Sequence, residues 1–231
     1  VSTDDDETEL FLVEGESAGG SAKQARDRNF QAVMSLKGKI LNTWEVDTGS
    51  ITQSQEVKDI SLALGLEPGC SDLNGLRYGK VCILADADSD GAHIATLLCA
   101  LFLRHFRPLV EAGKVFVAQP PLYRVDQGKE VFYALDDEEK DDLVKELGKK
   151  NKSKKIEVQR FKGLGEMNPE ELWETTLNPE NRTMLRVQYT KGTKDKSKED
   201  QKMIEVLMGD EVAPRKDFIT NNALDVVNLD I

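Results

Sequence analysis

The sequence predicts an α/β fold, in which a mainly parallel sheet is flanked by helices and followed by a helical C-terminal tail. Short apolar runs alternate along the chain with longer segments of helical periodicity. The apolar runs lack polar alternation, which is typical of strands covered on both faces in parallel sheets. Strand–helix alternation of this kind indicates βαβ units. The 231 residues suffice for one large domain, or for one domain with a smaller appended part.

The first half of the chain supplies the predicted parallel strands and the helices that cover them. The strands are expected at residues 10–13, 81–85 and 114–119. The helices are expected from Ser21 onward, at 54–66 and at 91–110. We expect a tight glycine turn before Ser21 and helix ends at Gly65 and Pro108. Residues 36–42, with two lysines around a glycine, are predicted to be a loop or a short strand.

The second half is predicted to begin with a hairpin and to end in helices. The expected elements are a hairpin of 122–125 and 131–135, a polar helix at 136–148, a solvated lysine-rich loop at 149–155 and a strand at 155–161. Asn168 and Pro169 predict a helix start, and Asn178-Pro179 repeats that signal. About the last 50 residues are interpreted as helical segments separated by a charged linker at 191–200.

Carboxylates directly follow two of the predicted strands. Glu14 comes after the first apolar run, and Asp86, Asp88 and Asp90 come after the second. Because ligands of parallel sheets bind beyond the carboxyl ends of the strands, neighbouring strands would bring Glu14, Asp86 and Asp88 to one edge. Carboxylates so close together repel one another, and they either protonate or attract a cation.

Four interpretations of this acidic cluster remain open from the residues alone. An EF-hand loop needs a bidentate Glu where Leu97 stands, and a helix where the strand precedes the cluster. A phosphatase of the haloacid dehalogenase type would use Asp86 as nucleophile, but its motif usually continues with Thr or Val rather than Ser89. A solvated turn does not need three acids at the end of a buried strand. An open magnesium site that admits a phosphodiester accounts best for the oxygen ligands.

The charge distribution limits the partners of the chain. A net charge of −11 argues against a general nucleic-acid coat protein. Basic residues nevertheless gather at 17–43, five against one aspartate, and at 145–162, eight against two glutamates. Such patches can hold one phosphate backbone locally. Neither a membrane span nor a secretory signal is expected, and the three widely spaced cysteines fit a reducing cytosol.

Five ordered blocks of residues carry a resemblance to a known family. They are EGESAGGSAK (14–23), LKGKILN (36–42), DADSDGAHI (86–94), QPPLYRV (119–125) and RFKGLGEMNP (160–169). Together they resemble the TOPRIM region of bacterial type IIA topoisomerases, from about residue 8 onward. The stretch KILNTWEV is more similar to the B subunit of topoisomerase IV than to that of DNA gyrase, whereas the ending LMGDEVAPRKDFITNNALDVVNLDI is gyrase-like. On balance the resemblance favours topoisomerase IV.

The resemblance implies roles for the residues at matching positions. Glu14, Asp86 and Asp88 match the acids that bind one or two Mg²⁺ ions, and Glu14 also matches an acid/base of strand rejoining. Asp90 completes the DxDxD motif and is expected to act with them by orienting ligands or water. The other matches are Lys37, Lys39 and Asn42 for DNA contact, and Glu16 and Lys37 for contact with quinolone-type drugs. His93, Arg160 and Lys162 are candidate supporting residues, with purely structural roles as the alternative.

The implied reaction is Mg²⁺-dependent, reversible cleavage and rejoining of double-stranded DNA, in chromosome decatenation and supercoil relaxation. The resemblance places the attacking tyrosine on a partner A subunit of a heterotetramer. Packing roles are therefore expected for Tyr78, Tyr123, Tyr133 and Tyr189. ATP would act only through an N-terminal domain missing from this sequence, so the chain is expected to be inactive alone. The expected location is cytoplasmic and nucleoid-associated, without a membrane partner.

The sequence divides into three expected parts. Residues 1–125 form a metal-binding TOPRIM domain, residues 126–159 a hairpin, polar helix and basic loop, and residues 160–231 the RFKGLGEMNP segment with the helical tail. Two functions of other classes remain as alternatives. One is a non-catalytic assembly module whose acids hold an ion for structural purposes, and the other is a primase or nuclease that acts without a partner.

Overall fold

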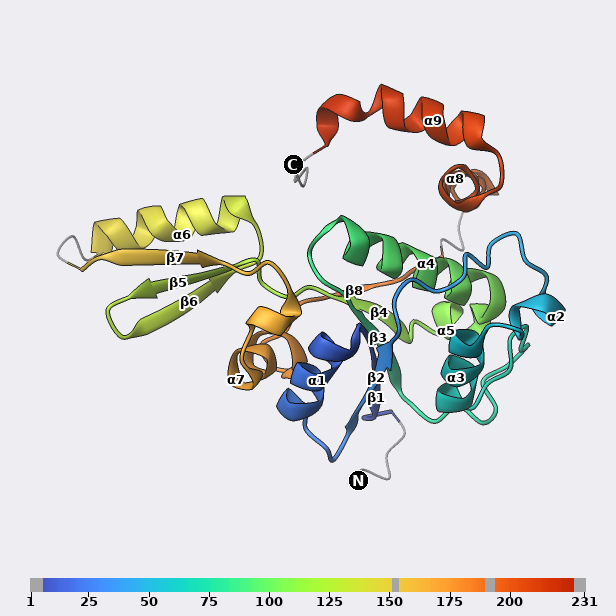
Figure 1. Cartoon of the computed structure of the whole chain (residues 1–231), viewed down its shortest axis with the longest axis horizontal. Coiled ribbons are helices and arrows are strands. Elements are labelled where there is room, and N and C mark those ends of the chain that lie inside the picture. Colours follow the sequence, from blue (N-terminus) through green and yellow to red (C-terminus); the bar gives the residue numbers. More distant parts are fainter. Residues whose placement is uncertain (1–5, 151–153, 190–193, 227–231) are drawn as a thin grey trace.

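A five-stranded main sheet lies at the centre of the computed structural model, which describes residues 6–150, 154–189 and 194–226 (Figure 1). Its strand order is β2-β1-β3-β4-β8. The strands are β2 (Gln31–Leu36), β1 (Glu9–Glu14), β3 (Lys80–Leu84), β4 (Val115–Ala118) and β8 (Met184–Arg186). The first four are parallel and β8 is antiparallel to β4. The predicted α/β fold with a mainly parallel sheet is confirmed.

Helices cover both faces of this sheet, and each face carries its own hydrophobic core. Alternate residues of β1 point to opposite faces: Leu10 and Leu12 belong to one core, Phe11 and Val13 to the other. The first core is closed by α2 (Thr48–Ile51), α3 (Gln55–Leu64), α4 (Ser89–His105) and α5 (Arg107–Glu111). The second core is closed by α1 (Glu16–Ala25) and α7 (Pro169–Leu172). A strand buried on both faces explains why its sequence is apolar throughout.

The direction in which successive strands are added to the sheet reverses between β1 and β3. The connection from β1 through α1 leads outward to β2, whereas the connection from β3 through α4 and α5 leads the other way to β4. The helices of these two connections lie on opposite faces, as in doubly wound sheets. The carboxyl ends of β1 and β3 therefore flank a topological switch point, where a crevice opens in such folds.

The start of α1 differs from the prediction. The helix begins at Glu16 rather than at Ser21, and Gly15, with φ 73°, alone forms the turn after β1. Gly19 lies inside the helix and faces β2, where a Cβ atom would lie 1.9 Å from Oγ of Ser35. The glycine therefore allows close helix–strand packing there, and not a turn.

Three other predictions about local structure are wrong. Pro108 does not end the long helix, which stops at His105; the proline instead lies in the first turn of the next helix, α5, which begins at Arg107. Asn178-Pro179 starts no helix, because the Asn178 side chain accepts a hydrogen bond from the N–H of Glu180 in a turn. Strands β2 and β8 were not predicted. Of the expected linker at 191–200, residues 194–200 belong to α8 (Lys194–Met208), and residues 191–193 lie outside the described residues. Helix α3 ends at Gly65 as expected, and β3 ends at Leu84, one residue before the predicted end.

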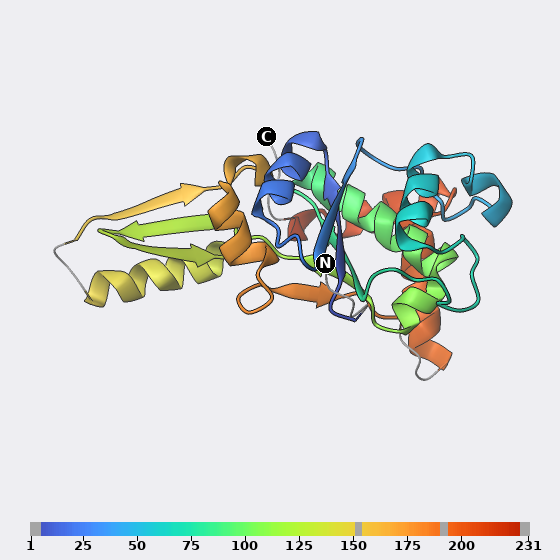
Figure 2. The ribbon, with the colours of Figure 1, turned by 90° about the horizontal axis from the view of Figure 1, so that it is seen from below.

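A second, three-stranded small sheet projects from the main sheet (Figures 1 and 2). It contains the predicted hairpin, β5 (Tyr123–Gln127) and β6 (Glu130–Ala134), together with β7 (Ile156–Arg160), in the order β6-β5-β7. Helix α6 (Asp137–Lys150) covers one face of it. Tyr123 Oη donates to Asp137 at the start of α6, and Gln127 Nε2 donates to the carbonyl of Leu147 near its end. The division of the chain at residues 125 and 159 stays a prediction.

The C-terminal tail is helical, as predicted. Helix α8 packs its last residue, Met208, into the first core, and α9 (Val212–Asn221) follows with no buried side chain. A short 3₁₀ helix (Ala223–Asp225) ends the described tail. Within the described ranges, no helix is long and apolar enough to cross a lipid bilayer.

Candidate functional site: an acidic edge at the switch point

Three adjacent strands of the main sheet end at the same edge with charged residues. Val13 pairs with Leu84, and Glu14 pairs with Leu36, so the residues after β3 and β2 lie on either side of Glu14. Asp86 and Asp88 follow β3, while the loop after β2 begins with Lys37. The sequence prediction that Glu14 and the aspartates meet at one edge is therefore realised by the strand pairing. We call Glu14, Asp86, Asp88 and Asp90 the acidic edge.

A hydrogen bond joins the two strand ends directly. The backbone N–H of Asp86 donates to Oε2 of Glu14 at 3.2 Å. Glu14 is half-buried, because the first turn of α1 and the loop after β3 stand on either side of it. The bond leaves the second carboxylate oxygen of Glu14 without a described protein partner and holds the side chain over the switch point.

The Asp86 carboxylate is held by a segment far away in the sequence. Its Oδ1 atom accepts a hydrogen bond of 2.8 Å from the N–H of Leu164, the first residue of a 3₁₀ turn (Leu164–Glu166). The preceding residue, Gly163, packs so closely that a Cβ atom on it would lie 2.8 Å from Oδ2 of Asp86. The KGLGE stretch therefore acts as the clamp that orients Asp86. The φ of Gly163, −170°, is extended, so its backbone conformation does not require glycine. Glycine is needed here because the close contact with Asp86 leaves no room for a side chain.

Asp88 and Asp90 have different local roles. Oδ1 of Asp88 accepts the N–H of Gly91 at 2.7 Å and so caps the N-terminus of α4. Asp90, in the first turn of α4, forms an ion pair of 2.8 Å with Nζ of Lys39 from the loop after β2. Both partners of this pair are largely exposed, so it contributes little to stability. It does show that a predicted DNA-contacting lysine reaches the acidic edge.

The carboxylates of the acidic edge repel one another, and this repulsion adds to the effect of burial on the pKa values of Glu14 and Asp86. Burial raises the pKa of Glu14, and the nearby charges of Asp86, Asp88 and Asp90 raise it further against the opposing hydrogen bond from Asp86. Burial likewise raises the pKa of Asp86, against the Leu164 hydrogen bond, with added repulsion from Asp88 and Glu166. By contrast, the hydrogen bond and charge of Lys39 lower the pKa of Asp90. A cation at Glu14 and Asp86 would relieve this repulsion.

The candidate ligands of the acidic edge are of the chemical type that Mg²⁺ prefers. All candidate ligands are carboxylates, the oxygen donors that Mg²⁺ prefers, and Glu14 and Asp86 each keep one oxygen outside the hydrogen bonds described above. Among the residues that the structure describes, however, no group of three or more His, Cys, Asp or Glu side chains is gathered closely enough to hold a metal. Mg²⁺ commonly takes one or two protein carboxylates and completes its shell with water and phosphate, which this open edge allows.

The other predicted site residues are placed unequally. Lys37 and Glu16 are exposed beside the edge, and His93 is exposed on the second turn of α4. Asn42 is instead engaged with the tail: its Nδ2 donates to the carbonyl of Met208 at 2.8 Å, and its Oδ1 accepts from Trp44 N–H. Arg160 and Lys162 are exposed at the end of β7, next to the clamp. The roles of all these residues stay predictions.

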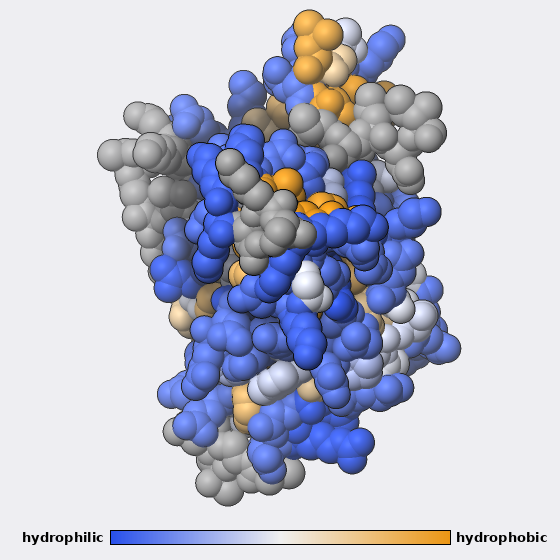
Figure 3. All heavy atoms as spheres, turned by 90° about the vertical axis from the view of Figure 1, so that its left-hand side faces the viewer, coloured by the Kyte–Doolittle hydropathy of each residue, from blue (hydrophilic) through white to orange (hydrophobic). Residues whose placement is uncertain are grey.

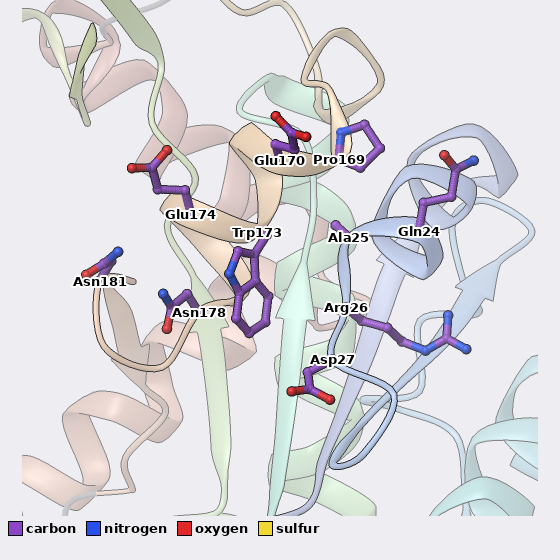
Figure 4. A pocket seen from close by; sticks show the side chains of 10 residues that line it. All are labelled: Gln24, Ala25, Arg26, Asp27, Pro169, Glu170, Trp173, Glu174, Asn178 and Asn181. Atoms are coloured by element: carbon purple, nitrogen blue, oxygen red, sulfur yellow. The ribbon is translucent and has the colours of Figure 1, made fainter. Parts of the chain in front are cut away.

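A cleft of about 640 Å³ runs from the acidic edge along the start of α4 to the end of β4. Asp86 and Asp88 lie in its wall together with Gln119 and Pro120, and Val226 at the end of the described tail closes one side. A second cleft of about 670 Å³ lies at the other end of α1, as Figure 4 shows, with Trp173 in its wall and Arg26 and Asp27 on the side of α1. Because α1 has 10 residues and spans about 15 Å, this second cleft is separate from the acidic edge.

Sequence reasoning missed the two residues that hold Asp86, Gly163 and Leu164. Leu164 acts through its backbone N–H, which any residue but proline offers, so the residue type carried no signal. Gly163 did carry a signal in the sequence, because a glycine at such a position marks either a turn or a close approach of the backbone to another group. Only the fold decides between the two.

Comparison with known proteins agrees with the architecture. Residues 9–120 match the Toprim domain family, and residues 153–220 match the family described as DNA gyrase B subunit, carboxyl terminus. The B subunit of DNA topoisomerase 4 from Pseudomonas aeruginosa is 66% identical over 179 residues, 78% of this chain and 28% of that protein. The corresponding protein of Escherichia coli is 64% identical over 196 residues, 85% of this chain and 30% of that protein.

The B subunit of DNA gyrase from Thermotoga maritima is 50% identical over 231 residues, 100% of this chain and 35% of that protein. The chain thus spans about a third of the length of these curated relatives. The two family matches cover the main sheet, the acidic edge, the clamp and most of the tail. The chain belongs to the family of bacterial type IIA topoisomerase B subunits, of which it comprises the Toprim domain and the gyrase-B-type carboxyl-terminal region.

Proposed function

We propose that the acidic edge is the metal-dependent half of a DNA cleavage and rejoining site, which a tyrosine-bearing A subunit completes. The observation that carries the proposal is the convergence of three strand ends, with lysines after β2, Glu14 as the last residue of β1 and the aspartates after β3. Carboxylates at such an edge suit a metal, and lysines beside them suit a phosphodiester backbone. The relatives named as topoisomerase subunits support the same assignment.

Glu14, Asp86 and Asp88 are the residues that would hold Mg²⁺, as one ion or two. When bound, the ion supplies charge stabilisation for the oxygens around the scissile phosphate. Asp90 would orient ligands or water next to them. The clamp at Leu164 fixes the direction of the Asp86 carboxylate, and the Asp86 N–H does the same for Glu14. Orienting bonds of this kind support metal ligands in many proteins.

The side chains around the edge have separate tasks in this proposal. Glu14 serves as the acid/base that moves a proton at the 3′ hydroxyl during rejoining. Lys37 and Lys39 bind the backbone beside the break, and Asn42 holds their loop in place against the tail. Glu16 and Lys37 would border the site of quinolone-type drugs. His93, Arg160 and Lys162 support the substrate from α4 and from the end of β7.

The tyrosines of this chain support a nucleophile on the partner. Tyr123 donates to Asp137, and this bond together with burial raises the pKa of its hydroxyl. Burial also raises the pKa of Tyr133, and Arg107 stacks on the ring of Tyr189. Tyr78 packs against the first core. A raised pKa lowers the fraction of the nucleophilic phenolate, so Tyr123 and Tyr133 are poorly suited to attack DNA. Tyr78 and Tyr189 are engaged in packing contacts.

At the level of the whole protein, we propose a topoisomerase IV in preference to a gyrase, because the topoisomerase 4 relatives named above are more similar to this chain than the gyrase relative. Decatenation and supercoil relaxation would be its reactions, and ATP would act through an N-terminal part of the longer protein. The working place of such an enzyme is the nucleoid in the cytoplasm.

Plasmid cleavage tests the proposal. The chain is combined with a purified A subunit and a drug that traps cleaved complexes, with and without Mg²⁺. We expect Mg²⁺-dependent linear DNA from the unchanged chain, and a loss of at least about 100-fold in Asp86→Ala and Asp88→Ala. Asp72→Ala, which removes an exposed aspartate in the loop before β3, is the matched control and should cleave normally. Undiminished cleavage by both edge variants would contradict the proposal and leave the acids with a structural role.

A further inference from the structure

Five lysines converge at the far end of the small sheet. Lys129 lies in the turn between β5 and β6, Lys149 and Lys150 end α6, and Lys154 and Lys155 precede β7. The strand pairing brings these three segments together, because Gln127 at the end of β5 pairs with Ile156 at the start of β7. Gln127 also bonds to Leu147 near the end of α6. We call these five lysines the basic tip.

The convergence could not be seen in the sequence. The run 149–155 is interpreted above as a solvated loop, and Lys129 stands 20 or more positions away from it. The side chain of Lys154 packs against the β5–β6 turn, where a Cβ atom on Gly128 would lie 3.2 Å from its Cδ. The fold thus adds a lysine from a different segment to the cluster.

Most of the positive charge at the tip is uncompensated. All five lysines are exposed. Among the described residues, Lys155 pairs with Glu157 at 2.9 Å, and Lys154 pairs more loosely with Glu130 at 3.9 Å. For Lys129, Lys149 and Lys150 no described carboxylate lies within ion-pair distance. Lys149 and Lys150 also stabilise the C-terminal end of the α6 dipole, but Lys129 and Lys154 have no such role. On a chain with a net charge of −11, such a cluster selects for a polyanion.

The position of the tip relates it to the acidic edge. Strand β7 runs from the tip to Arg160 and Lys162, both exposed, and the next residue, Gly163, touches Asp86. Helix α6, with 14 residues, spans about 21 Å from the junction to the tip. That length is less than one helical turn of B-DNA, about 34 Å. A duplex lying on the acidic edge needs only to continue along β7 to pass the tip.

The surface at this end is suited to phosphate and not to an apolar partner. Figure 3 looks at the molecule from the side of the small sheet, and the face it shows is hydrophilic over most of its area. We propose that the basic tip is a second DNA contact, which holds the sugar–phosphate backbone of the duplex flanking the cleavage segment. This inference rests on the proposed function, because it takes DNA at the acidic edge as given.

Duplex length separates this contact from the acidic edge. The complex of the chain with its A subunit is titrated with a short duplex that covers only the cleavage segment, and with a duplex several helical turns longer. The tip variant carries Lys129→Gln, Lys149→Gln, Lys150→Gln and Lys154→Gln. The matched control carries Lys58→Gln, Lys198→Gln, Lys202→Gln and Lys216→Gln, which remove the same charge from exposed helix positions elsewhere. Thermal unfolding followed by circular dichroism verifies that both variants fold.

We expect the tip variant to bind the long duplex at least about tenfold more weakly. The slope of log affinity against log salt should fall by about 2 to 4, at about 0.9 for each lost phosphate contact. Binding and cleavage of the short duplex should stay unchanged, and the control should match the unchanged chain. Equal slopes on the long duplex, or the same loss on both duplexes or in the control, would overturn the proposal. If Asp86→Ala still cleaves DNA but the tip variant shows the smaller salt slope, the proposed function fails and the DNA contact at the basic tip stands. If cleavage depends on Mg²⁺ and on Asp86 but the tip variant binds the long duplex normally, the proposed function stands and the DNA contact at the basic tip fails.

Discussion

The backbone N–H of Leu164 lies 2.8 Å from Oδ1 of Asp86, across 78 positions of sequence. This bond joins the carboxyl-terminal region to the first aspartate of the DxDxD motif. Gly163 completes the clamp by lying flat against the other oxygen of the same carboxylate. The orientation of the candidate metal ligand is thus decided by a segment outside the Toprim match, which ends at residue 120.

Gly163→Ala should damage the site without damaging the fold. Its φ of −170° suits any residue, so the added Cβ acts only through its contact at 2.8 Å with Oδ2 of Asp86. We expect Mn²⁺ affinity, measured by electron paramagnetic resonance, to fall about 10- to 100-fold. Gly20→Ala, where a Cβ meets nothing within 4 Å, is the control and should keep the affinity. An unchanged affinity in Gly163→Ala would mean that Asp86 does not bind the metal in the orientation seen here.

Lys39→Gln should weaken DNA binding and leave stability nearly unchanged. The ion pair with Asp90 is exposed on both sides and screened by solvent, so its loss should barely change the free energy of unfolding. If Lys39 also contacts one phosphate, the slope of log affinity against log salt should fall by about 0.9, as measured by fluorescence anisotropy with a short duplex. Lys58→Gln on α3 is the control. An equal fall of the salt slope in Lys58→Gln would contradict a direct contact between Lys39 and a DNA phosphate.

Glu9 should make the fold sensitive to acid. This buried carboxylate receives hydrogen bonds from Arg182 and Gln31 and an ion pair from Lys80. Burial raises its pKa, but the hydrogen bonds and charges of these partners outweigh burial, and the pKa lies below its usual value. Because the folded pKa is lower than the unfolded one, the stabilisation is complete above the unfolded pKa, about 4.3, and is lost as the pH falls through the folded value.

Urea unfolding at a series of pH values between 7 and 3 measures this effect. Glu9→Gln should lose about 3 kcal/mol at pH 7, because Arg182 then stays buried without its partner. Its unfolding free energy should also depend less on pH below about 4.5 than that of the unchanged chain. Glu67→Gln, at an exposed position, should reproduce the acid sensitivity of the unchanged chain. A Glu9→Gln chain with full acid sensitivity would assign that sensitivity to other carboxylates.

His105 should make the fold weaker in mild acid. The imidazole is buried at the end of α4, and its Nε2 lies 2.9 Å from the carbonyl of Thr43, to which it donates. Burial lowers the pKa, as does Arg104, against the Thr43 bond and Asp47. The folded state therefore keeps the neutral form, while the unfolded state takes up a proton below about pH 6.5, so unfolding free energy falls as the pH drops through that value.

The two histidines of the chain allow a direct comparison. His105→Gln should remove the fall in unfolding free energy between pH 7 and pH 5, on top of a general loss of about 1 to 3 kcal/mol from the broken buried hydrogen bond. His93→Gln, at an exposed position, should keep the fall. If both variants keep it, the proton uptake belongs to another group.

The strongly periodic and strongly apolar elements could be predicted from sequence. Strands β1 and β3 are buried on both faces, and short apolar runs such as VCILA are typical of strands covered on both faces. Strand β2 was not predicted because it is an edge strand, partly exposed, and its sequence QAVMSL mixes polar and apolar residues. Strand β8 has three residues, too few for any periodicity, and is defined only by its pairing with β4.

Local signals also have more than one structural meaning. Asn168 and Asn178 both precede a proline, but Asn168 bonds three residues ahead in a capping box, whereas Asn178 bonds two residues ahead in a turn. In the site, the strand order placed Glu14 beside Asp86 as the spacing predicted. The basic stretch at 145–162 was visible in the sequence, but the clamp and the joining of Lys129 to that stretch could not be predicted, because each depends on contacts between segments that the sequence keeps far apart.

The position of Arg182 has a consequence for biosynthesis. Its guanidinium neutralises Glu9 on the first strand, 173 residues earlier, and strand β8 immediately after it covers the free edge of β4. While the chain is being made, β1 and β4 leave the ribosome long before Arg182 and β8 exist, so Glu9 lacks its arginine partner and one sheet edge is open. We expect the main sheet to reach its final state only once nearly all of the chain has been synthesised. The amino-terminal two thirds, made alone, would then be prone to aggregate, and the carboxyl-terminal region would be as necessary for a soluble Toprim domain as for the orientation of Asp86 in the acidic edge.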